Sequence, residues 1–337
     1  MLSKYCLLIE SCVWGFLVTL MISPFIISFI KREKVGQVIL NYVEEHRYKV
    51  GTPTMGGVIF LISISIVSFI CFSGSSKLAK MTIFIFFAFG LVGFLDDFIK
   101  FKFNRNLGLK AYQKIIFQLL ISVAIGFYVY KSKYVGGILV VPFTKYVIDI
   151  DYWIIPLIAI IYLATTNSVN LTDGLDGLAT STTFSYMLVF VPLMLVLFQT
   201  IFIGFDEVQM SELFNILIVC AVTIGAMLSF LVFNCFPAKI FMGDTGSLAI
   251  GSLVASVAVF SRLDLYIPII GIMFVASSVS VILQVAYYKL TKKRIFLMAP
   301  LHHHFQMHGV HEVRITTIYS LITAFVGAIV IIINILV

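Results

Sequence analysis

The amino-acid sequence predicts an all-α protein that crosses a membrane many times. Of its 337 residues, 61% are hydrophobic and 12% are charged, and the mean hydropathy is +1.08. The apolar residues gather in long runs, and roughly 17–25 such residues form a helix that crosses about 30 Å of hydrocarbon. Because lipid offers no partner to unpaired backbone groups, these runs are expected to be helical. We expect about ten transmembrane helices in one integral membrane domain, residues 1–337.

Ten apolar runs follow one another along the chain. They cover residues 12–30, 54–73, 81–95, 112–130, 153–169, 180–203, 214–234, 246–260, 266–288 and 316–336. The first run stops at the basic cluster "KREK" (31–34), and the third stops at Asp96 and Asp97. The connection at 131–152 contains "YVGGILVVPF", where Gly-Gly beside β-branched residues predicts a small β-hairpin.

Lys and Arg are spread unevenly over the connections between these runs. The odd-numbered connections (31–53, 96–111, 170–179, 235–245 and 289–315) hold fifteen of them, whereas the N-terminus and the even-numbered connections hold seven. Basic connections face the cytoplasm, so we expect both chain ends to lie outside. The net charge of +7 then reflects topology and attraction to anionic lipid headgroups. We expect no nucleic-acid partner.

Five aspartates lie on the predicted cytoplasmic side, at the ends of apolar runs. They are Asp96, Asp97, Asp173, Asp176 and Asp244. An ionised aspartate at the centre of a membrane helix would cost roughly 2.5–3.5 kcal/mol, and a wet cleft at the inner rim would remove most of that cost. We therefore expect these acids to face one shared cleft.

Some of these acids also have an ordinary structural explanation. Asp173 and Asp176 could be the N-cap and a first-turn acid of the helix that follows them, and Asp244 could be a first-turn acid as well. The glycines around them favour a second explanation, because N–H groups at the helix start in "GDTGS" (243–247) suit a phosphate. Mg²⁺ binds carboxylates and phosphate oxygens together, so the pattern indicates a metal–diphosphate site.

Asp96 and Asp97 are adjacent in the sequence. On a helix their side chains would point about 100° apart. We expect them to serve different partners, one oriented to metal or basic residues and the other to a reacting hydroxyl or phosphate. A solvated interfacial cluster with Lys100, Lys102 and Arg105 is the alternative.

Two further connections on the same side carry polar motifs. The segment "KKRIFLMAPLHHHFQMHGVHEVR" (292–314) holds five of the six histidines, which could form a zinc site, lie at the lipid interface, or contact phosphate and sugar groups. The segment "YKVGTPTMGG" (48–57) combines Lys49 and Thr54 with glycines and could be a turn with a helix cap. The sequence has no GxxxxGK[ST] phosphate-binding loop, so nothing in it supports an ATP-driven pump.

Five motifs resemble those of the phospho-N-acetylmuramoyl-pentapeptide transferases. This family is the translocase I group within the polyprenyl-phosphate N-acetylhexosamine-1-phosphate transferase superfamily. The motifs are "GTPTMGG" (51–57), "LDD" (95–97), "NLTDGLDGLA" (170–179), "FMGDTGSLA" (241–249) and "APLHHHF" (299–305). They span nearly the whole chain, and their order is the order expected for the family.

The resemblance implies a reaction of bacterial peptidoglycan biosynthesis. Phospho-N-acetylmuramoyl-pentapeptide would pass from its UDP-linked donor to undecaprenyl phosphate, giving lipid I and UMP, with Mg²⁺ as cofactor. It also implies a multi-pass protein of the bacterial inner (cytoplasmic) membrane with its active site at the cytoplasmic face, and members of the family are commonly homodimers.

The resemblance also implies roles for individual residues. Asp96, Asp97 and Asp244 would be catalytic, with Asp244 associated with the metal. The implied substrate contacts are Lys49, Thr54, Lys114, Asn170, Asp173, Asp176, Phe241, Gln284, His303 and His304, with Phe241 a stacking surface for uracil.

Two alternatives remain open at this point. Another polyprenyl-phosphate transferase, using a UDP-N-acetylhexosamine, would suit the acidic motifs equally, although "PTMGG" and "PLHHHF" favour the muramoyl-pentapeptide enzymes. A secondary transporter also places acids in membrane cavities. It would usually place them near the bilayer midplane, whereas here they lie at the ends of runs.

Overall fold

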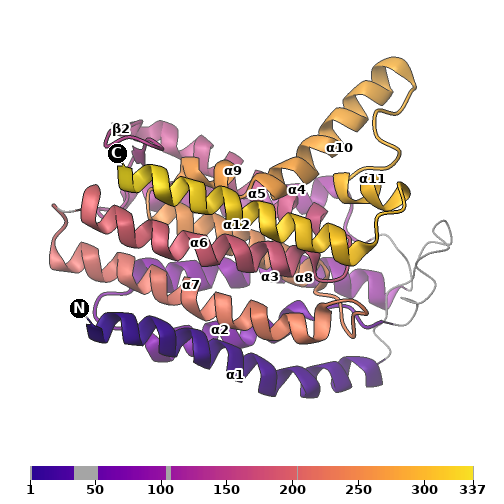
Figure 1. Cartoon of the computed structure of the whole chain (residues 1–337), viewed down its shortest axis with the longest axis horizontal. Coiled ribbons are helices and arrows are strands. Elements are labelled where there is room, and N and C mark those ends of the chain that lie inside the picture. Colours follow the sequence, from indigo (N-terminus) through magenta and orange to yellow (C-terminus); the bar gives the residue numbers. More distant parts are fainter. Residues whose placement is uncertain (1, 34–51, 104–107, 203, 337) are drawn as a thin grey trace.

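A computed structural model shows a bundle of long helices, most of them side by side (Figure 1). It describes residues 2–33, 52–103, 108–202 and 204–336. Within these ranges, nine helices are long and apolar enough to cross a membrane. The prediction of an all-α, multi-pass membrane protein is confirmed.

The long helices follow the predicted apolar runs, with ends that differ by several residues. In chain order they are α1 (Leu2–Arg32), α3 (Lys77–Lys102), α4 (Ala111–Lys131), α5 (Ile154–Thr172), α6 (Leu178–Thr200), α7 (Glu207–Asn234), α8 (Gly243–Phe260), α10 (Ile272–Thr291) and α12 (Glu312–Leu336). The second run forms α2 (Gly57–Cys71), whose 15 residues are fewer than a membrane crossing usually needs. A short helix, α11 (Leu301–Met307), carries three of the histidines.

The predicted run 266–288 is broken, so the expectation of one continuous helix there was wrong. A 3-10 turn, η3 (Asp264–Tyr266), leads into the short α9 (Ile267–Ile270), and α10 starts after Gly271. Gly271 lacks the Cβ that would meet the carbonyl oxygen of Ile267 at 2.7 Å, so the chain bends closely at this position. Beyond the break, α10 leaves the direction of the bundle and projects from it (Figure 1).

Helix α8 is the most enclosed of the long helices, with 89% of its membrane-length window buried. Its first turn touches two neighbours through glycines. A Cβ at Gly57 of α2 would collide with the backbone of Gly246, and a Cβ at Gly93 of α3 would collide with the backbone of Asp244. Small residues let membrane helices approach this closely. The start of α2, the end of α3 and the start of α8 therefore meet at one point.

The predicted hairpin at 131–152 is present. Strand β1 (Ile138–Val140) pairs antiparallel with β2 (Val147–Asp149), with Ile138 opposite Asp149, and a 3-10 turn, η2 (Asp151–Trp153), leads into α5. The hairpin lies at the same end of the bundle as both chain termini (Figure 1). Placing both termini at one end agrees with an even number of crossings, and which side of the membrane this end faces stays a prediction.

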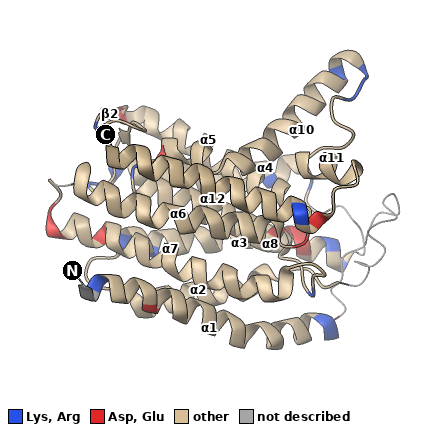
Figure 2. Ribbon diagram, viewed as in Figure 1, with Lys and Arg blue, Asp and Glu red and all other residues tan. Residues whose placement is uncertain are grey.

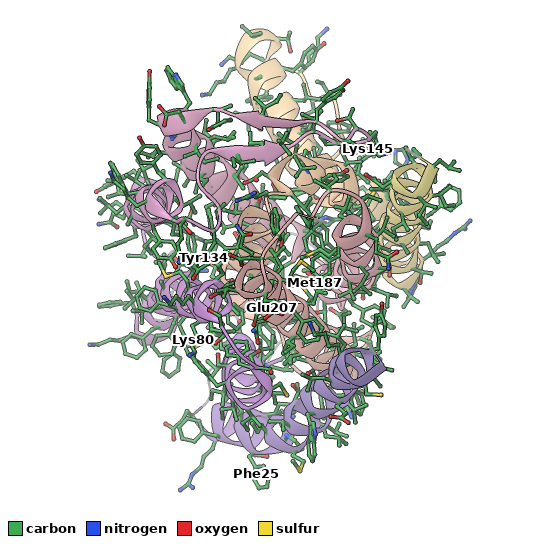
Figure 3. All side chains as sticks on the ribbon, turned by 90° about the vertical axis from the view of Figure 1, so that its left-hand side faces the viewer. Phe25, Lys80, Tyr134, Lys145, Met187 and Glu207 are labelled. Atoms are coloured by element: carbon green, nitrogen blue, oxygen red, sulfur yellow. The ribbon has the colours of Figure 1, made fainter. Side chains whose placement is uncertain are left out.

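The outer surface of the bundle is apolar. Figure 2 shows Lys, Arg, Asp and Glu mostly toward the two ends of the helices, with the middle nearly free of them. On α1, Phe25 is 77% exposed and points away from the bundle (Figure 3), and Ile9, Met21 and Phe29 are exposed on the same helix. Such a surface is unfavourable in water and suits contact with lipid chains.

Candidate active site

Three aspartates from two helices meet at the end of the bundle opposite the termini. Asp96 and Asp97 lie in the last two turns of α3, and Asp244 lies in the first turn of α8. One ligand oxygen from each lies within 4.8 Å of the others. Acidic residues gather beside the start of α8 at this end (Figure 2). The predicted convergence of these three acids is therefore present in the structure.

Asp97 binds the start of α8. Its carboxylate accepts hydrogen bonds from the backbone N–H of Asp244 (3.2 Å), and from the backbone N–H (2.9 Å) and hydroxyl (2.7 Å) of Thr245. Gly243, at φ +69°, makes room, because a Cβ there would lie 2.5 Å from Asp97 Oδ2. The expectation that these N–H groups would receive a phosphate was wrong for two of them, because the protein supplies its own anion.

Asp244 is held by side chains from three helices. Its Oδ2 accepts from the ammonium groups of Lys100 (2.7 Å) and Lys114 (3.0 Å), and its Oδ1 accepts from the amide of Asn170 (2.6 Å). The same amide of Asn170 donates to the hydroxyl of Ser247 at 2.7 Å. The structure thus brings Lys114 and Asn170 directly to the predicted metal-associated aspartate.

Lys100 lies at the centre of the cluster, whereas the sequence placed it only in an alternative interfacial cluster. Its Nζ lies 2.6 Å from Asp96 Oδ2, 2.7 Å from Asp244 Oδ2 and 3.7 Å from Asp97 Oδ1. A signal was present in the sequence, because Lys100 follows Asp96 and Asp97 by four and three residues, the spacing of helix ion pairs. Asp96 also accepts from the backbone N–H of Leu109 at 2.8 Å.

The expectation that Asp96 and Asp97 would serve separate partners needs correction. Oxygens of both approach the same point as Asp244, and the ammonium group of Lys100 lies close to all three carboxylates. Their directions do differ, since Asp97 bonds α8 whereas Asp96 bonds Leu109. Adjacent positions on α3 can still reach a common point when the end of a second helix, α8, packs against them.

The chemistry of this cluster fits Mg²⁺. Carboxylate oxygens are preferred ligands of Mg²⁺, and three of them converge within bonding range of one cationic group. Three aspartates and two lysines sum to a charge of −1 (−3 + 2), so the cluster keeps an excess of negative charge. Asp244, the only one of the three aspartates that is not fully buried, is the most accessible ligand.

The loop between α5 and α6 is arranged differently from a simple helix cap. Asp173 ends α5, and α6 begins after Gly177 at φ +70°. Asp176 is buried, and its carboxylate accepts from the backbone N–H of Ala238 at 2.9 Å. The alternative in which Asp173 and Asp176 cap the following helix is therefore wrong. Asp176 instead ties this loop to the segment that precedes α8.

His302 packs against the same loop and was also missed. Its ring is fully buried, and a Cβ at Gly174 would collide with its Nε2, so the glycine provides space for the ring. Burial, together with neighbouring His303, holds the pKa of His302 well below its usual range. His302 is therefore neutral near pH 7, and a side chain at position 174 would displace it.

Phe241 and Thr54 are brought together by a backbone pairing before α2 and α8. The N–H of Phe241 donates to the carbonyl of Pro53 (2.9 Å), and the N–H of Gly56 donates back to the carbonyl of Phe241 (2.8 Å). Thr54 Oγ1 lies close to Gly243, at 2.9 Å from where a Cβ would be. Thr54 is thus beside the aspartates, and Lys49 lies outside the described residues.

The remaining predicted contacts lie on α10 and α11. The side chain of Gln284 bonds the backbone of Ile295 and Phe296, so among the described residues it organises the α10–α11 connection. His303 contacts Gln306, and His304 Nδ1 accepts from the N–H of Leu297. Gln284, His303 and His304 stay predicted substrate contacts.

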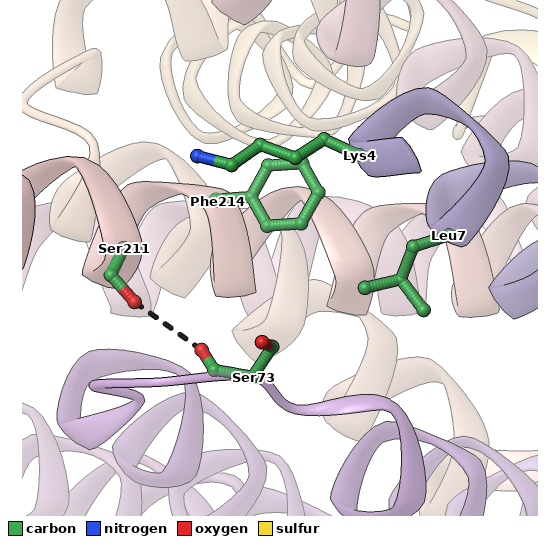
Figure 4. Close-up of a pocket in the computed structure, with 5 residues that line it drawn as sticks. All are labelled: Lys4, Leu7, Ser73, Ser211 and Phe214. Atoms are coloured by element: carbon green, nitrogen blue, oxygen red, sulfur yellow. Dashed lines mark hydrogen bonds between the residues drawn. The ribbon is translucent and has the colours of Figure 1, made fainter. Parts of the chain in front are cut away.

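A cavity of about 330 Å³ lies at the other end of the bundle (Figure 4). It is lined by Lys4, Leu7, Ser73, Ser211 and Phe214. Lys4 Nζ lies over the ring of Phe214, and the hydroxyl of Ser211 donates to the carbonyl of Ser73 at 3.2 Å. These residues come from the start of α1, the start of α7 and the α2–α3 connection. The cavity is therefore separate from the aspartate cluster.

Comparisons with known proteins agree with the motifs. The chain matches Glycosyl transferase family 4 over residues 78–262 and the phospho-N-acetylmuramoyl-pentapeptide-transferase signature 1 over residues 49–61. It is 44% identical over 318 residues to the phospho-N-acetylmuramoyl-pentapeptide-transferase of Clostridium novyi (strain NT), covering 94% of each chain. It is 43% identical over 310 residues to that of Clostridioides difficile (strain 630), covering 92% of each. The chain therefore belongs to the phospho-N-acetylmuramoyl-pentapeptide transferase family.

Proposed function

We propose that this protein transfers phospho-N-acetylmuramoyl-pentapeptide from its UDP-linked donor to undecaprenyl phosphate, giving lipid I and UMP in peptidoglycan biosynthesis. The observation that carries this proposal is the sequence similarity to phospho-N-acetylmuramoyl-pentapeptide-transferases, which extends over more than nine tenths of the chain. The signature at residues 49–61 supports the muramoyl-pentapeptide donor over a UDP-N-acetylhexosamine.

The position of the aspartates at one end of the helices suits these two substrates. A polyprenyl acceptor stays in the bilayer, whereas a nucleotide–sugar donor stays in the cytosol, so only a site at the membrane rim meets both. We propose that this end faces the cytoplasm and that the protein resides in the bacterial inner membrane. The basic residues of the connections support that orientation.

In the proposed reaction, an oxygen of the lipid phosphate attacks the β-phosphorus of the UDP-linked donor. The bond between that phosphorus and the bridging oxygen of UMP breaks, UMP leaves, and a lipid-linked diphosphate remains. A phosphate monoester is largely deprotonated near neutral pH, with a second pKa of about 6. Direct attack therefore needs no covalent aspartyl-phosphate.

The residues of the chain would orient this reaction. Asp244 would hold Mg²⁺ with help from Asp96, and the bound ion would supply positive charge against the diphosphate and the departing UMP. Asn170 fixes the direction of the Asp244 carboxylate through its 2.6 Å hydrogen bond. Asp97 fixes the first turn of α8 and, with it, the backbone of Asp244.

The proposed substrate contacts form a second group around this centre. Asn170, Asp173, Asp176 and Phe241 would contact the nucleoside and its phosphates, and the others are Lys49, Thr54, Lys114, Gln284, His303 and His304. A homodimer stays a prediction.

A UMP-release assay with the purified protein tests the proposal. Purified protein is supplied with undecaprenyl phosphate and either UDP-N-acetylmuramoyl-pentapeptide or UDP-N-acetylglucosamine, with and without a chelator of divalent ions. We expect UMP only from the muramoyl-pentapeptide donor, and its loss with chelator. Turnover confined to UDP-N-acetylglucosamine would overturn the choice of donor, and undiminished turnover in chelator would overturn the role of Mg²⁺.

A further inference from the structure

The ammonium group of Lys100 occupies the point on which the three carboxylates converge. Its Nζ lies 2.6 Å from Asp96 Oδ2 and 2.7 Å from Asp244 Oδ2, with Asp97 Oδ1 at 3.7 Å. A second ammonium, that of Lys114, lies 3.0 Å from the same Asp244 oxygen. The oxygen best placed to bind a metal ion therefore already has two cationic partners supplied by the chain.

A divalent ion and these ammonium groups need the same oxygens. An ion that bound Asp244 Oδ2 together with Asp96 would meet Lys100 at close range, and like charges about 4 Å apart repel strongly in a partly buried site. Either the lysine moves or the ion binds weakly.

The members of the cluster differ in how freely their side chains can move when an ion binds. Asp97 is buried, and its oxygens are held by backbone and hydroxyl donors of α8, so it stays in place. The Lys100 side chain is 34% exposed and stands on a flexible four-carbon stem at the end of α3. The ammonium group of Lys100 is therefore the part of the cluster that can move away from the carboxylates.

We propose that Lys100 is a tethered counter-ion that competes with the metal ion and yields its place only when an anionic substrate phosphate offers it a new partner. This inference rests on the proposed function, because it concerns the same site. Metal alone then binds weakly, whereas metal and nucleotide phosphate strengthen each other's binding by the same factor. The lysine would thereby offset part of the negative charge of the carboxylates between turnovers.

The test measures Mn²⁺ binding to the detergent-solubilised protein by electron paramagnetic resonance, first without any nucleotide. In Lys100→Met we expect Mn²⁺ to bind about tenfold or more tightly than in the wild type, because the competing charge is gone. Lys100→Arg, which keeps the charge, should bind like the wild type. Lys102→Met is the matched control, because Lys102 is an exposed lysine two residues further along the same helix. It should change Mn²⁺ affinity less than twofold.

The second arm adds UMP. In the wild type we expect UMP to tighten Mn²⁺ binding several-fold, and in folded Lys100→Met to have little further effect. Equal or weaker Mn²⁺ binding by folded Lys100→Met would overturn the inference. If that variant does not fold, the wild type decides, and the absence of any coupling between UMP and Mn²⁺ would overturn it.

These outcomes are separate from those of the proposed function. The Mn²⁺ measurements without nucleotide need no turnover, so a protein that failed to release UMP could still show the effect of Lys100. Conversely, normal UMP release with unchanged Mn²⁺ affinity in Lys100→Met would remove this inference alone.

Discussion

At the scale of single residues, Asp244 is the aspartate that pairs with both lysines of the site. Its carboxylate balances two ammonium groups and accepts from Asn170. Asp244→Asn keeps the shape but removes the charge that a metal ion and both lysines need. We expect Mg²⁺-dependent UMP release to fall by about 100-fold or more, while gel filtration and thermal unfolding show a folded protein. Near-normal activity in detergent would contradict the role given to Asp244.

Asp97 plays a different part, because its oxygens accept three hydrogen bonds from the start of α8. In Asp97→Asn, an NH2 group replaces one of the two oxygens and cannot accept from the donor it faces, so we expect α8 to shift and carry Asp244 with it. We expect the kcat for UMP release to fall more than the KM for the donor rises. A loss of donor affinity with an unchanged kcat would contradict this.

Thr245→Ala is the matched control for Asp97. It removes one hydroxyl donor at 2.7 Å but leaves the carboxylate and both backbone donors in place. The loss of one such hydrogen bond costs about 0.5–1.5 kcal/mol. We expect its melting temperature to fall modestly, with a much smaller change in kcat than in Asp97→Asn.

At the scale of elements, the helices were predictable because apolar length is a local property of the sequence. Each apolar run corresponds to helix, and the hairpin followed from Gly-Gly beside β-branched residues. The break at Gly271 was not predicted, because apolar residues lie on both sides of it within the run 266–288. Hydropathy shows where a helix can lie, but not where its neighbours allow it to bend.

The β1–β2 hairpin has an exposed aromatic surface that suits the membrane interface. Tyr146 is 76% exposed, and Tyr152 and Trp153 are exposed beside it where α5 begins. Tyr and Trp are enriched at the headgroup level of bilayers. A short hairpin, unlike a helix, does not satisfy all of its backbone groups within itself, so it suits the headgroup region better than the hydrocarbon core. We therefore expect the ring of Trp153 to lie among the lipid headgroups.

Fluorescence quenching tests this position, because the chain has only two tryptophans. Trp14→Phe leaves Trp153 as the sole emitter in vesicles of brominated lipid. We expect bromines near the headgroup to quench Trp153 more than bromines deep in the chains. Trp153→Phe is the control, since it leaves Trp14 of α1 as the sole emitter and reports its quenching separately. If only water-soluble acrylamide quenched the emission of Trp153, the hairpin would not lie at the membrane interface.

At the scale of the whole molecule, the site depends on contacts that no local pattern reveals. Asp97 and Thr245 are 148 positions apart, and Lys114 and Asp244 are 130 apart. The sequence indicated that the acids belong to one site, because all of them fell on one predicted side of the membrane. It did not indicate which carboxylate would hold a helix start, because that follows from the close contacts at Gly57 and Gly93.

The arrangement of the bundle predicts opposite accessibility for its two ends. Cys235 is exposed just after α7, at the end that holds the aspartates, and Gly204 is exposed between α6 and α7 with open space around its Cβ position.

In intact cells, a maleimide that cannot cross membranes should leave Cys235 unlabelled until the cells are permeabilised. In a Cys235→Ser background, Gly204→Cys should be labelled without permeabilisation, because the basic connections place its end outside. A parent with Cys235→Ser and no added cysteine measures the contribution of the other four cysteines. The reverse pattern would put the aspartates on the outer face, where a cytosolic nucleotide–sugar donor could not reach them.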